Sequence, residues 1–168
     1  DTANVTALTT AQTMALTNGQ MAALTSDQLQ ALTTLQISTL KATQIAALTS
    51  EQISAIETAD IKALTAVQAA ALGSDQVAAL TTSQIAALET VDLKALTTAA
   101  VAAMGTDQIV ALNSVQAASL TAAQVAALTT GQLEAIDVVD LAAMSSAQLV
   151  NISAGRIGAL TTDQIVGL

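Results

Sequence analysis

Three pairs of carboxylates, each spaced three residues apart, are the side chains best suited to chemistry. The pairs are Glu57 with Asp60, Glu89 with Asp92, and Asp137 with Asp140. Residues three apart share one face of a helix, so each pair could supply oxygen ligands to Ca²⁺. Two carboxylates are too few for an ion that takes six to eight oxygens, and no glycine-rich loop accompanies them. We therefore favour a structural role in which the acids complement the helix dipole and Thr58 or Thr90 caps the helix.

The composition removes most other chemistry. The chain has no His and no Cys, so it lacks the commonest general base and metal ligand and cannot form disulfides. It has no Phe, Tyr or Trp on which a base or sugar could stack. Its 4 basic and 13 acidic residues give a net charge of −9, which repels nucleic acid. We predict no catalytic residues, no cofactor, no enzymatic activity and no nucleic-acid partner.

A strict repeat of eight residues determines the elements that position these acids. The 168 residues divide into 21 octads, from 1–8 to 161–168, with no insertion or deletion. The octad is approximately Thr-Thr-x-Gln-Ile-x-Ala-Leu, with an aliphatic residue or Met always at position eight and mostly Ile, Leu or Val at position five. Positions three and six vary freely and are predicted to face solvent. The sequence therefore predicts one repeat array over 1–168, without separate domains.

Each octad carries the signals that start a helix. Thr81 is followed three residues later by Gln84, which is the spacing of a capping box. Leu80, before the cap, and Ile85, in the first turn, have the spacing of a hydrophobic staple. These signals recur in nearly every octad, so a new short helix is predicted every eight residues.

A single long helix and a β-solenoid are the alternatives to short helices. In a continuous helix, eight residues advance about 800°, so the apolar side chains would drift about 80° per octad and form no stripe. A β-solenoid fits the many Thr, Ile and Val residues. However, positions five and eight would face opposite sides of a strand, and 7 Gly with no Pro provide few turns. We predict an all-α solenoid of short capped helices, with the β-solenoid as the alternative.

The octads must stack, because one octad cannot fold alone. Burying one Ile and one Leu contributes roughly 3–6 kcal/mol, whereas ordering eight residues costs on the order of 12 kcal/mol. The acidic octad that begins at Glu57 recurs four octads later at Glu89 and a further six octads later at Asp137. The common divisor of these two intervals is two octads, so we interpret the coil as two octads per turn.

Threonine and glutamine recur at fixed positions, and both have more than one interpretation. The Thr-rich first two positions suggest a hydroxyl face that binds ice or another surface, or acceptors for O-linked sugars, but helix capping already explains them. The Gln at position four suggests an amyloid-like ladder, yet the capping box accounts for it more simply. Arg156 and Ala100 replace this Gln and are interpreted as sequence drift.

Membrane insertion is not expected, and the ends of the array are apolar. The mean hydropathy is +0.60. A polar residue nevertheless interrupts every octad, whereas a transmembrane helix needs about 18 consecutive apolar residues, and no signal peptide is evident. Solenoids normally end in polar capping repeats, but the first octad keeps Val5 and Leu8 and the last keeps Ile165 and Leu168. We expect the ends to join flanking repeats of a longer chain or further copies of this one.

These motifs carry two resemblances to known proteins. The phrase Leu-Thr-x-x-Gln-Ile resembles the first helix of the repeats in transcription-activator-like DNA-binding proteins, but those repeats are longer and basic. The segments 79–88 (ALTTSQIAAL) and 88–96 (LETVDLKAL) resemble the Leu-Thr-Thr-x-Gln-Ile-x-Ala-Leu arrays of large secreted or surface-exposed bacterial proteins, including adhesin-like ones. This second resemblance covers the whole chain and implies a bacterial, extracellular, non-enzymatic role.

The leading functional hypothesis is a structural protein, outside the cell or at its surface, that serves as a stalk, spacer or filament subunit with an inert acidic surface. The alternative is a surface-binding or adhesion module whose exposed Thr or acidic faces hold glycans, Ca²⁺ or a host surface. A third hypothesis is an accessory region of an enzyme whose catalytic domain lies outside this chain.

Overall fold

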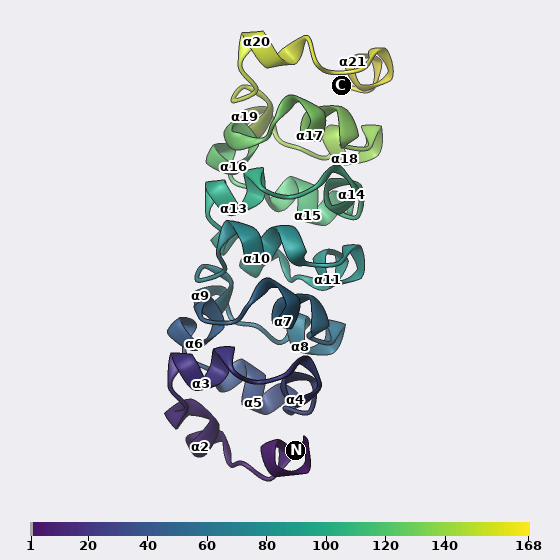
Figure 1. The fold of residues 1–168 in the computed structure, drawn as a ribbon. Coiled ribbons are helices and arrows are strands. Elements are labelled where there is room, and N and C mark those ends of the chain that lie inside the picture. The colour runs from purple at the N-terminus through teal and green to yellow at the C-terminus, as the bar shows by residue number, and fades with distance from the viewer. Residues whose placement is uncertain (1) are drawn as a thin grey trace.

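The computed structural model describes residues 2–168 and consists of short helices joined by extended residues (Figure 1). Each octad forms one helix, and the described residues contain no strand. The predicted all-α solenoid with one short helix per repeat is confirmed, and the β-solenoid alternative is wrong. Asp1, which the octad pattern places at the first helix cap, lies outside the described residues. The helices within 2–168 are α1 (Thr2–Thr6), α2 (Thr10–Ala15), α3 (Asn18–Ala22), α4 (Ser26–Gln30), α5 (Thr34–Thr39), α6 (Ala42–Ala46), α7 (Ser50–Ala55), α8 (Thr58–Lys62), α9 (Ala66–Ala69), α10 (Ser74–Ala79), α11 (Thr82–Ala87), α12 (Thr90–Ala95), α13 (Thr98–Ala102), α14 (Thr106–Val110), α15 (Ser114–Ser119), α16 (Ala122–Ala127), α17 (Thr130–Ala135), α18 (Val138–Ala142), α19 (Ser146–Leu149), α20 (Ala154–Ile157) and α21 (Thr162–Gly167).

The helices begin where the capping boxes predict. Before α11, Thr81 has an extended backbone with φ −71° and ψ 160°. Its hydroxyl accepts a hydrogen bond from the backbone N–H of Gln84 at 3.2 Å, and the side-chain oxygen of Gln84 accepts one from the backbone N–H of Thr81 at 2.7 Å. Each side chain satisfies an amide that has no partner within the helix. Such caps matter here because helices this short are not stable on their own.

The helices end without glycine. Leu88, after α11, is extended with φ −59° and ψ 132°, and its backbone N–H donates to the carbonyl of Ile85 at 3.2 Å. Glu89 is also extended, with φ −70° and ψ 150°, so two consecutive extended residues turn the chain into α12. No residue within 2–168 has a positive φ. Because every turn uses conformations open to all L-residues, the repeat requires neither Gly nor Pro.

The helices stack into an elongated coil whose two ends lie far apart (Figure 1). Nearly every helix packs against the helix three octads away, as α10 packs against α7 and α13. Hydrogen bonds between successive coils join residues 28 and 31 apart, so one coil takes between three and four octads. The interpretation of two octads per coil is wrong. Two helices cannot surround a core, whereas three to four enclose the side chains of positions five and eight.

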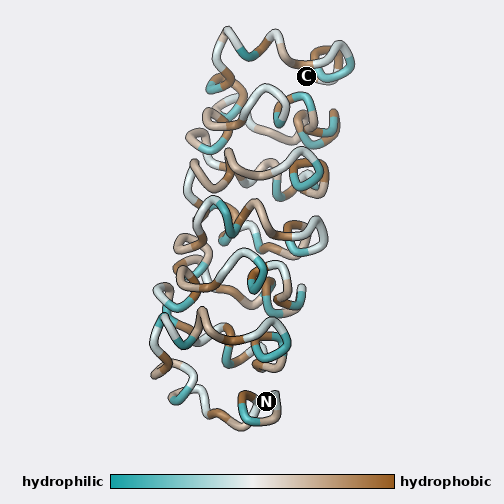
Figure 2. The backbone as a smooth tube through the Cα atoms, viewed as in Figure 1, coloured by the Kyte–Doolittle hydropathy of each residue, from teal (hydrophilic) through white to brown (hydrophobic). Residues whose placement is uncertain are grey.

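The core runs along the inside of the coil. Ile85 and Leu88, at positions five and eight, are 0% and 3% exposed, and one cluster of buried apolar residues extends from Val5 to Leu160. Figure 2 shows hydrophobic and hydrophilic residues alternating along every coil. Positions three and six, such as Ser83 and Ala86, are exposed as predicted. No helix within 2–168 is long and apolar enough to cross a membrane.

Candidate functional site

The side chain at position four connects each coil to the one before it. Gln84 is buried, and its side-chain nitrogen donates to the carbonyls of Ile53 at 2.9 Å and Ile56 at 2.7 Å. Its side-chain oxygen accepts from the backbone N–H of Thr81 at 2.7 Å. One amide group therefore satisfies the start of its own helix and the end of α7 in the preceding coil. We call this arrangement, a capping oxygen and a nitrogen that reaches the preceding coil, a glutamine joint.

The glutamine joint repeats with a constant register. In each joint the nitrogen donates to the carbonyls 31 and 28 residues earlier, which belong to positions five and eight of an earlier octad. Gln36, at the start of the series, makes only the bond to Leu8. The glutamines that make both bonds, at distances of 2.6–3.3 Å, are Gln44, Gln52, Gln68, Gln76, Gln84, Gln108, Gln116, Gln124, Gln132, Gln148 and Gln164.

The capping role predicted for these glutamines is confirmed, but sequence reasoning missed their role between coils. A capping box accepts Glu as well as Gln at its third helical position, and yet no octad has Glu at position four. An ionised carboxylate cannot donate to two carbonyls, so Gln rather than Glu suits the joint, although Asp occupies position four in three octads. The preference for Gln over Glu was the signal that position four also makes a donor contact outside its own helix.

The fold separates the two members of each carboxylate pair. The first members, Glu57, Glu89 and Asp137, occupy N-cap positions and are exposed. The second members, Asp60, Asp92 and Asp140, occupy position four and are buried. Within 2–168, no group of three or more Asp, Glu, His or Cys side chains lies close enough to hold a metal ion. A calcium site at a pair would therefore need carbonyl oxygens or water for most of its ligands.

Asp60 and Asp92 lie in the first turns of α8 and α12, where the dipole interpretation places them, and that interpretation stays a prediction. The predicted caps at Thr58 and Thr90 are wrong. Thr58 and Thr90 do not cap, because each is already the first helical residue, and the N-cap positions of these helices form no side-chain cap hydrogen bond. The octad register fixes the cap at position one, where a long acidic side chain replaces the usual Thr.

Asp92 is buried at a joint that lacks a donor. Its two carboxyl oxygens have no hydrogen-bond partner. Asp92 lies one octad after Gln84, so the carbonyls that correspond to Ile53 and Ile56 are those of Ile61 and Leu64, which can only accept. Burial, and to a lesser extent the charge of Glu89, raise the pKa of Asp92 to about 6. A protonated Asp92 regains the donor that the joint requires.

Asp140 is also buried at position four, but unlike Asp92 its carboxylate has a hydrogen-bond donor. Its carboxylate accepts a hydrogen bond from the hydroxyl of Ser114 on α15, the helix on which α18 packs.

Glu89, the N-cap residue of α12, forms an ion pair with Lys62 at 3.6 Å. Both of these side chains are largely exposed, so this pair contributes little to stability.

Asn4, Ala100 and Arg156 also replace Gln at position four, and the last two differ in kind. Arg156 donates through its guanidinium to the carbonyls of Leu128 and Ala126 in the preceding coil, so it keeps the contact between coils but not the capping half of the joint. A side chain with two suitably placed N–H donors can thus make this contact in place of Gln, and the interpretation of Arg156 as sequence drift stays a prediction. Ala100 is buried and has no side-chain donor, so the joint is lost there, although Thr97 still accepts from its backbone N–H at 3.1 Å.

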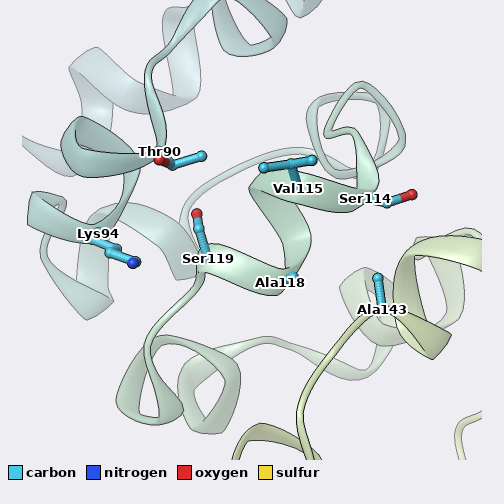
Figure 3. A pocket seen from close by; sticks show the side chains of 7 residues that line it. All are labelled: Thr90, Lys94, Ser114, Val115, Ala118, Ser119 and Ala143. Carbon is cyan, nitrogen blue, oxygen red and sulfur yellow. The ribbon is translucent and has the colours of Figure 1, made fainter.

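A shallow depression crosses three stacked helices, α12, α15 and α18 (Figure 3). Its volume is about 450 Å³. Figure 3 shows Thr90, Lys94 and Ser119 together on one side of it, and Ser114 and Ala143 on the other. The hydroxyl of Ser114 is engaged with Asp140. The depression is open to solvent, and its lining is more apolar than polar.

The geometry defines a class of protein: a helical solenoid of octads whose coils are linked by side-chain amides. The ALTTAQ repeat family matches residues 21–55, 53–90, 85–122 and 133–168. Because these segments cover more than half of the chain, the protein belongs to the ALTTAQ repeat family. No curated protein and no solved structure matches the chain. The family matches confirm a tandem-repeat array.

Proposed function

We propose that this protein is a structural spacer or stalk that holds its two ends a fixed distance apart. The observation that carries this proposal is the constant register of the joints from Gln36 to Gln164. Each added octad repeats the same contacts with the preceding coil. Length therefore grows with the number of octads while the cross-section stays the same.

The joints also make the rod stiff and stable. A typical hydrogen bond contributes about 0.5–1.5 kcal/mol net, and a buried group left without one costs about 1–3 kcal/mol. Each glutamine joint supplies three hydrogen bonds to backbone groups, as Gln84 does with Thr81, Ile53 and Ile56. Because such bonds link every coil to the next, bending the rod would break several of them at once.

The proposed setting is a bacterial cell surface or the extracellular space, and the proposed role is non-enzymatic. The resemblance to arrays of secreted and surface-exposed bacterial proteins supports this setting. The net charge of −9 and the exposed positions three and six give the rod a hydrated, acidic exterior. Like charge on neighbouring rods opposes lateral association, which suits a stalk or filament.

A surface-binding module for glycans, Ca²⁺ or a host surface is the second candidate, and an exposed apolar stripe favours it. The stripe consists of Val67, Val91, Val115 and Val139, which recur every three octads and are 58–70% exposed. They lie on α9, α12, α15 and α18, each of which packs against the next. The stripe passes the depression at Val115. Under this second candidate, exposed threonines would be acceptors for O-linked glycans.

Duplication of residues 65–128 tests the spacer proposal. This segment contains eight octads, and its duplication preserves every joint register. Small-angle X-ray scattering should show a maximum dimension that grows in proportion to the octads added, with an unchanged cross-section. An unchanged length or a thicker particle would refute the spacer. As a control, insertion of half an octad after position 128 breaks the octad register and should lower the melting temperature instead.

Substitution of the valine stripe separates the two candidates. Val91→Ser with Val115→Ser removes apolar surface without touching any joint, so rod length and melting temperature should be unchanged. Under the spacer proposal, beads coated with this variant should adhere to cells and to glycan arrays as well as beads coated with the unchanged chain. Loss of adherence in this variant, with adherence retained in Ser83→Ala, would favour the surface-binding module.

A further inference from the structure

Two successive glutamine joints are missing near the middle of the rod. Position four is Asp92 in the octad 89–96 and Ala100 in the octad 97–104. The carboxyl oxygens of Asp92 have no hydrogen-bond partner, and Ala100 has no side-chain donor. The joints on either side of this gap are complete, and they are those of Gln76, Gln84, Gln108 and Gln116. We call the contact of residues 89–104 with residues 57–72 of the preceding coil the seam.

Every other gap between Gln44 and Gln164 is isolated. Asp60 and Asp140 also replace Gln, but a complete joint lies on each side of each of them. These flanking joints are those of Gln52, Gln68, Gln132 and Gln148. Because one coil takes between three and four octads, an isolated gap leaves most joints of a coil in place. At the seam, two joints of one coil are lost together.

The seam brings hydrogen-bond acceptors together without donors. The register of 31 and 28 residues assigns the carbonyls of Ile61 and Leu64 to Asp92. An ionised carboxylate is itself an acceptor, so it cannot bind these carbonyls. Buried acceptors without donors are stabilised when water reaches them, and water reaches these groups only when the two coils tilt apart. The seam therefore favours opening, whereas a complete joint opposes it.

Apolar packing keeps the two coils together at the seam. α12 packs on α9 and α13 packs on α10, and Leu93 and Val101 in these helices are fully buried. Apolar contact is non-directional, so it tolerates a change of angle between coils that hydrogen bonds resist. The ion pair of Lys62 with Glu89 also crosses the seam, but both side chains are largely exposed, so it constrains the angle little. The two coils can therefore tilt without separating.

We propose that the seam is a hinge at which the rod bends, and that the charge of Asp92 controls its opening. The inference rests on the proposed spacer, because it divides an otherwise stiff rod into two stiff segments joined at residues 89–104. An ionised Asp92 opens the hinge by drawing water to the buried acceptors. A protonated Asp92 donates to a carbonyl of the preceding coil and closes the hinge, as an amide does elsewhere in the rod.

Few other charges act on Asp92. The helices that contact α12 from neighbouring coils, α9, α15 and α16, contain no ionisable residue. Across the seam α8 contributes Asp60 and Lys62, and the octad of Asp92 itself contains Glu89 and Lys94. Burial, and to a lesser extent the charge of Glu89, raises the pKa of Asp92 to about 6. The hinge is therefore closed at lower pH and opens as the pH rises through about 6.

Two spin labels on one chain measure the bending. The sequence contains no cysteine, so labels attach only to introduced ones. Thr43→Cys with Val115→Cys places the labels 72 residues apart across the seam, and Val91→Cys with Asp163→Cys places them 72 residues apart beyond it. All four residues are exposed and occupy position three of helices that stack on one another. Pulsed electron spin resonance gives the distribution of distances for each pair.

At about pH 8, where Asp92 is ionised, we expect a broader distribution for the pair across the seam than for the pair beyond it. Asp92→Gln with Ala100→Gln completes both joints and should narrow the first distribution to the width of the second. Asp60→Gln with Asp140→Gln is the matched control variant, since it fills two isolated gaps and should leave the width unchanged. Acidification to about pH 5 should narrow the distribution in the unchanged chain but not in Asp92→Gln with Ala100→Gln.

Equal widths for the two label pairs in the unchanged chain, or a width that the completed joints do not change, would overturn the hinge. A width that stays constant on acidification would overturn the control by Asp92. Circular dichroism establishes that each variant folds. If the variant with both joints completed unfolds, Ala100→Gln alone should still narrow the distribution, and an unchanged width there would count against the hinge. The spacer is tested by the length that added octads contribute, whereas the hinge is tested by the spread of one distance within a single chain, so failure of one proposal is distinguishable from failure of the other.

Discussion

The side-chain nitrogen of Gln84 lies 2.7 Å from the carbonyl oxygen of Ile56, 28 residues earlier, and this bond closes a helix end in another coil. Ile56 is the C-cap residue of α7, at the end where backbone carbonyls lack partners within the helix. The same amide group satisfies the start of α11. Helix ends are the weakest part of a short helix, and here one side chain stabilises two of them. The individual helices are thus stable only as members of the stack.

Removal of a position-four amide should strongly lower the free energy of unfolding only where the amide joins two coils. Gln84→Leu leaves the carbonyl of Ile56 and the backbone N–H of Thr81 without partners, and removes one of the two hydrogen bonds to the carbonyl of Ile53. We therefore expect it to lower the free energy of unfolding by about 2–4 kcal/mol. Gln12→Leu removes a capping box at the first coil, where no joint forms, and should cost about 1 kcal/mol. Urea denaturation followed by circular dichroism gives both values. Equal losses for the two variants would show that Gln84 acts only as a cap.

The buried acid at the α12 joint should make stability depend on pH. The pKa of Asp92 rises from 3.8 to about 6 on folding, because burial and Glu89 disfavour its charged form. The folded state therefore holds this proton more tightly than the unfolded state. The stability that protonated Asp92 provides is fully present below about pH 4 and is lost as the pH rises through about 6.

Asp92→Gln supplies the missing donor and removes the titration. We expect it to raise the free energy of unfolding by about 1–3 kcal/mol at pH 7, and by less at pH 4. Urea denaturation of both proteins between pH 4 and 8 gives the difference, in which the other acids cancel. Ala100→Gln is the control, because it completes a joint without removing a charge, so its gain should not change with pH. If the gain in the free energy of unfolding from Asp92→Gln were also constant with pH, the raised pKa of Asp92 would be contradicted.

Calcium should have little effect on the melting temperature. Each pair, such as Glu57 and Asp60, places one carboxylate on the surface and the other in the core, so the two do not converge on an ion. A ligand at about 1,000 times its Kd would stabilise the fold by about 4 kcal/mol, which a thermal melt readily detects. We expect no such shift with millimolar Ca²⁺ relative to Mg²⁺. A rise with Ca²⁺ alone, abolished by Asp60→Asn with Asp92→Asn, would support the surface-binding module.

The sequence was sufficient to predict the contacts made within an octad. Thr81 and Gln84 are close in sequence, so the rules for caps predict their hydrogen bonds directly. These local rules do not predict the number of octads per coil. It depends on the angle at which the extended residues, such as Leu88 and Glu89, join successive helices, and small changes in ψ accumulate over a whole coil. The joint was missed for the same reason, since its partners are 28 and 31 residues away.

Near the C-terminal end of the rod, the larger side chain of Val138 on α18 is matched by the small residue Gly167 on α21. Position two is usually Thr, Ser or Ala, and position seven is usually Ala, but here a larger residue faces a smaller one. α21 packs on α18, and a β-carbon at Gly167 would overlap the side chain of Val138. The backbone of Gly167 has no positive φ, so its small size rather than its conformational freedom is what the site requires.

Gly167→Ala should therefore destabilise the chain, although the same change inside a helix normally stabilises it by up to about 1 kcal/mol. We expect a loss of about 1–3 kcal/mol from the overlap with Val138. In the Val138→Ala background the overlap is absent, and Gly167→Ala should become neutral or stabilising. A double-mutant cycle of the free energies of unfolding, with hydrogen exchange of the α18 and α21 amides as the local measurement, gives the coupling. Additive effects of the two substitutions would show that α21 does not pack on α18 as described.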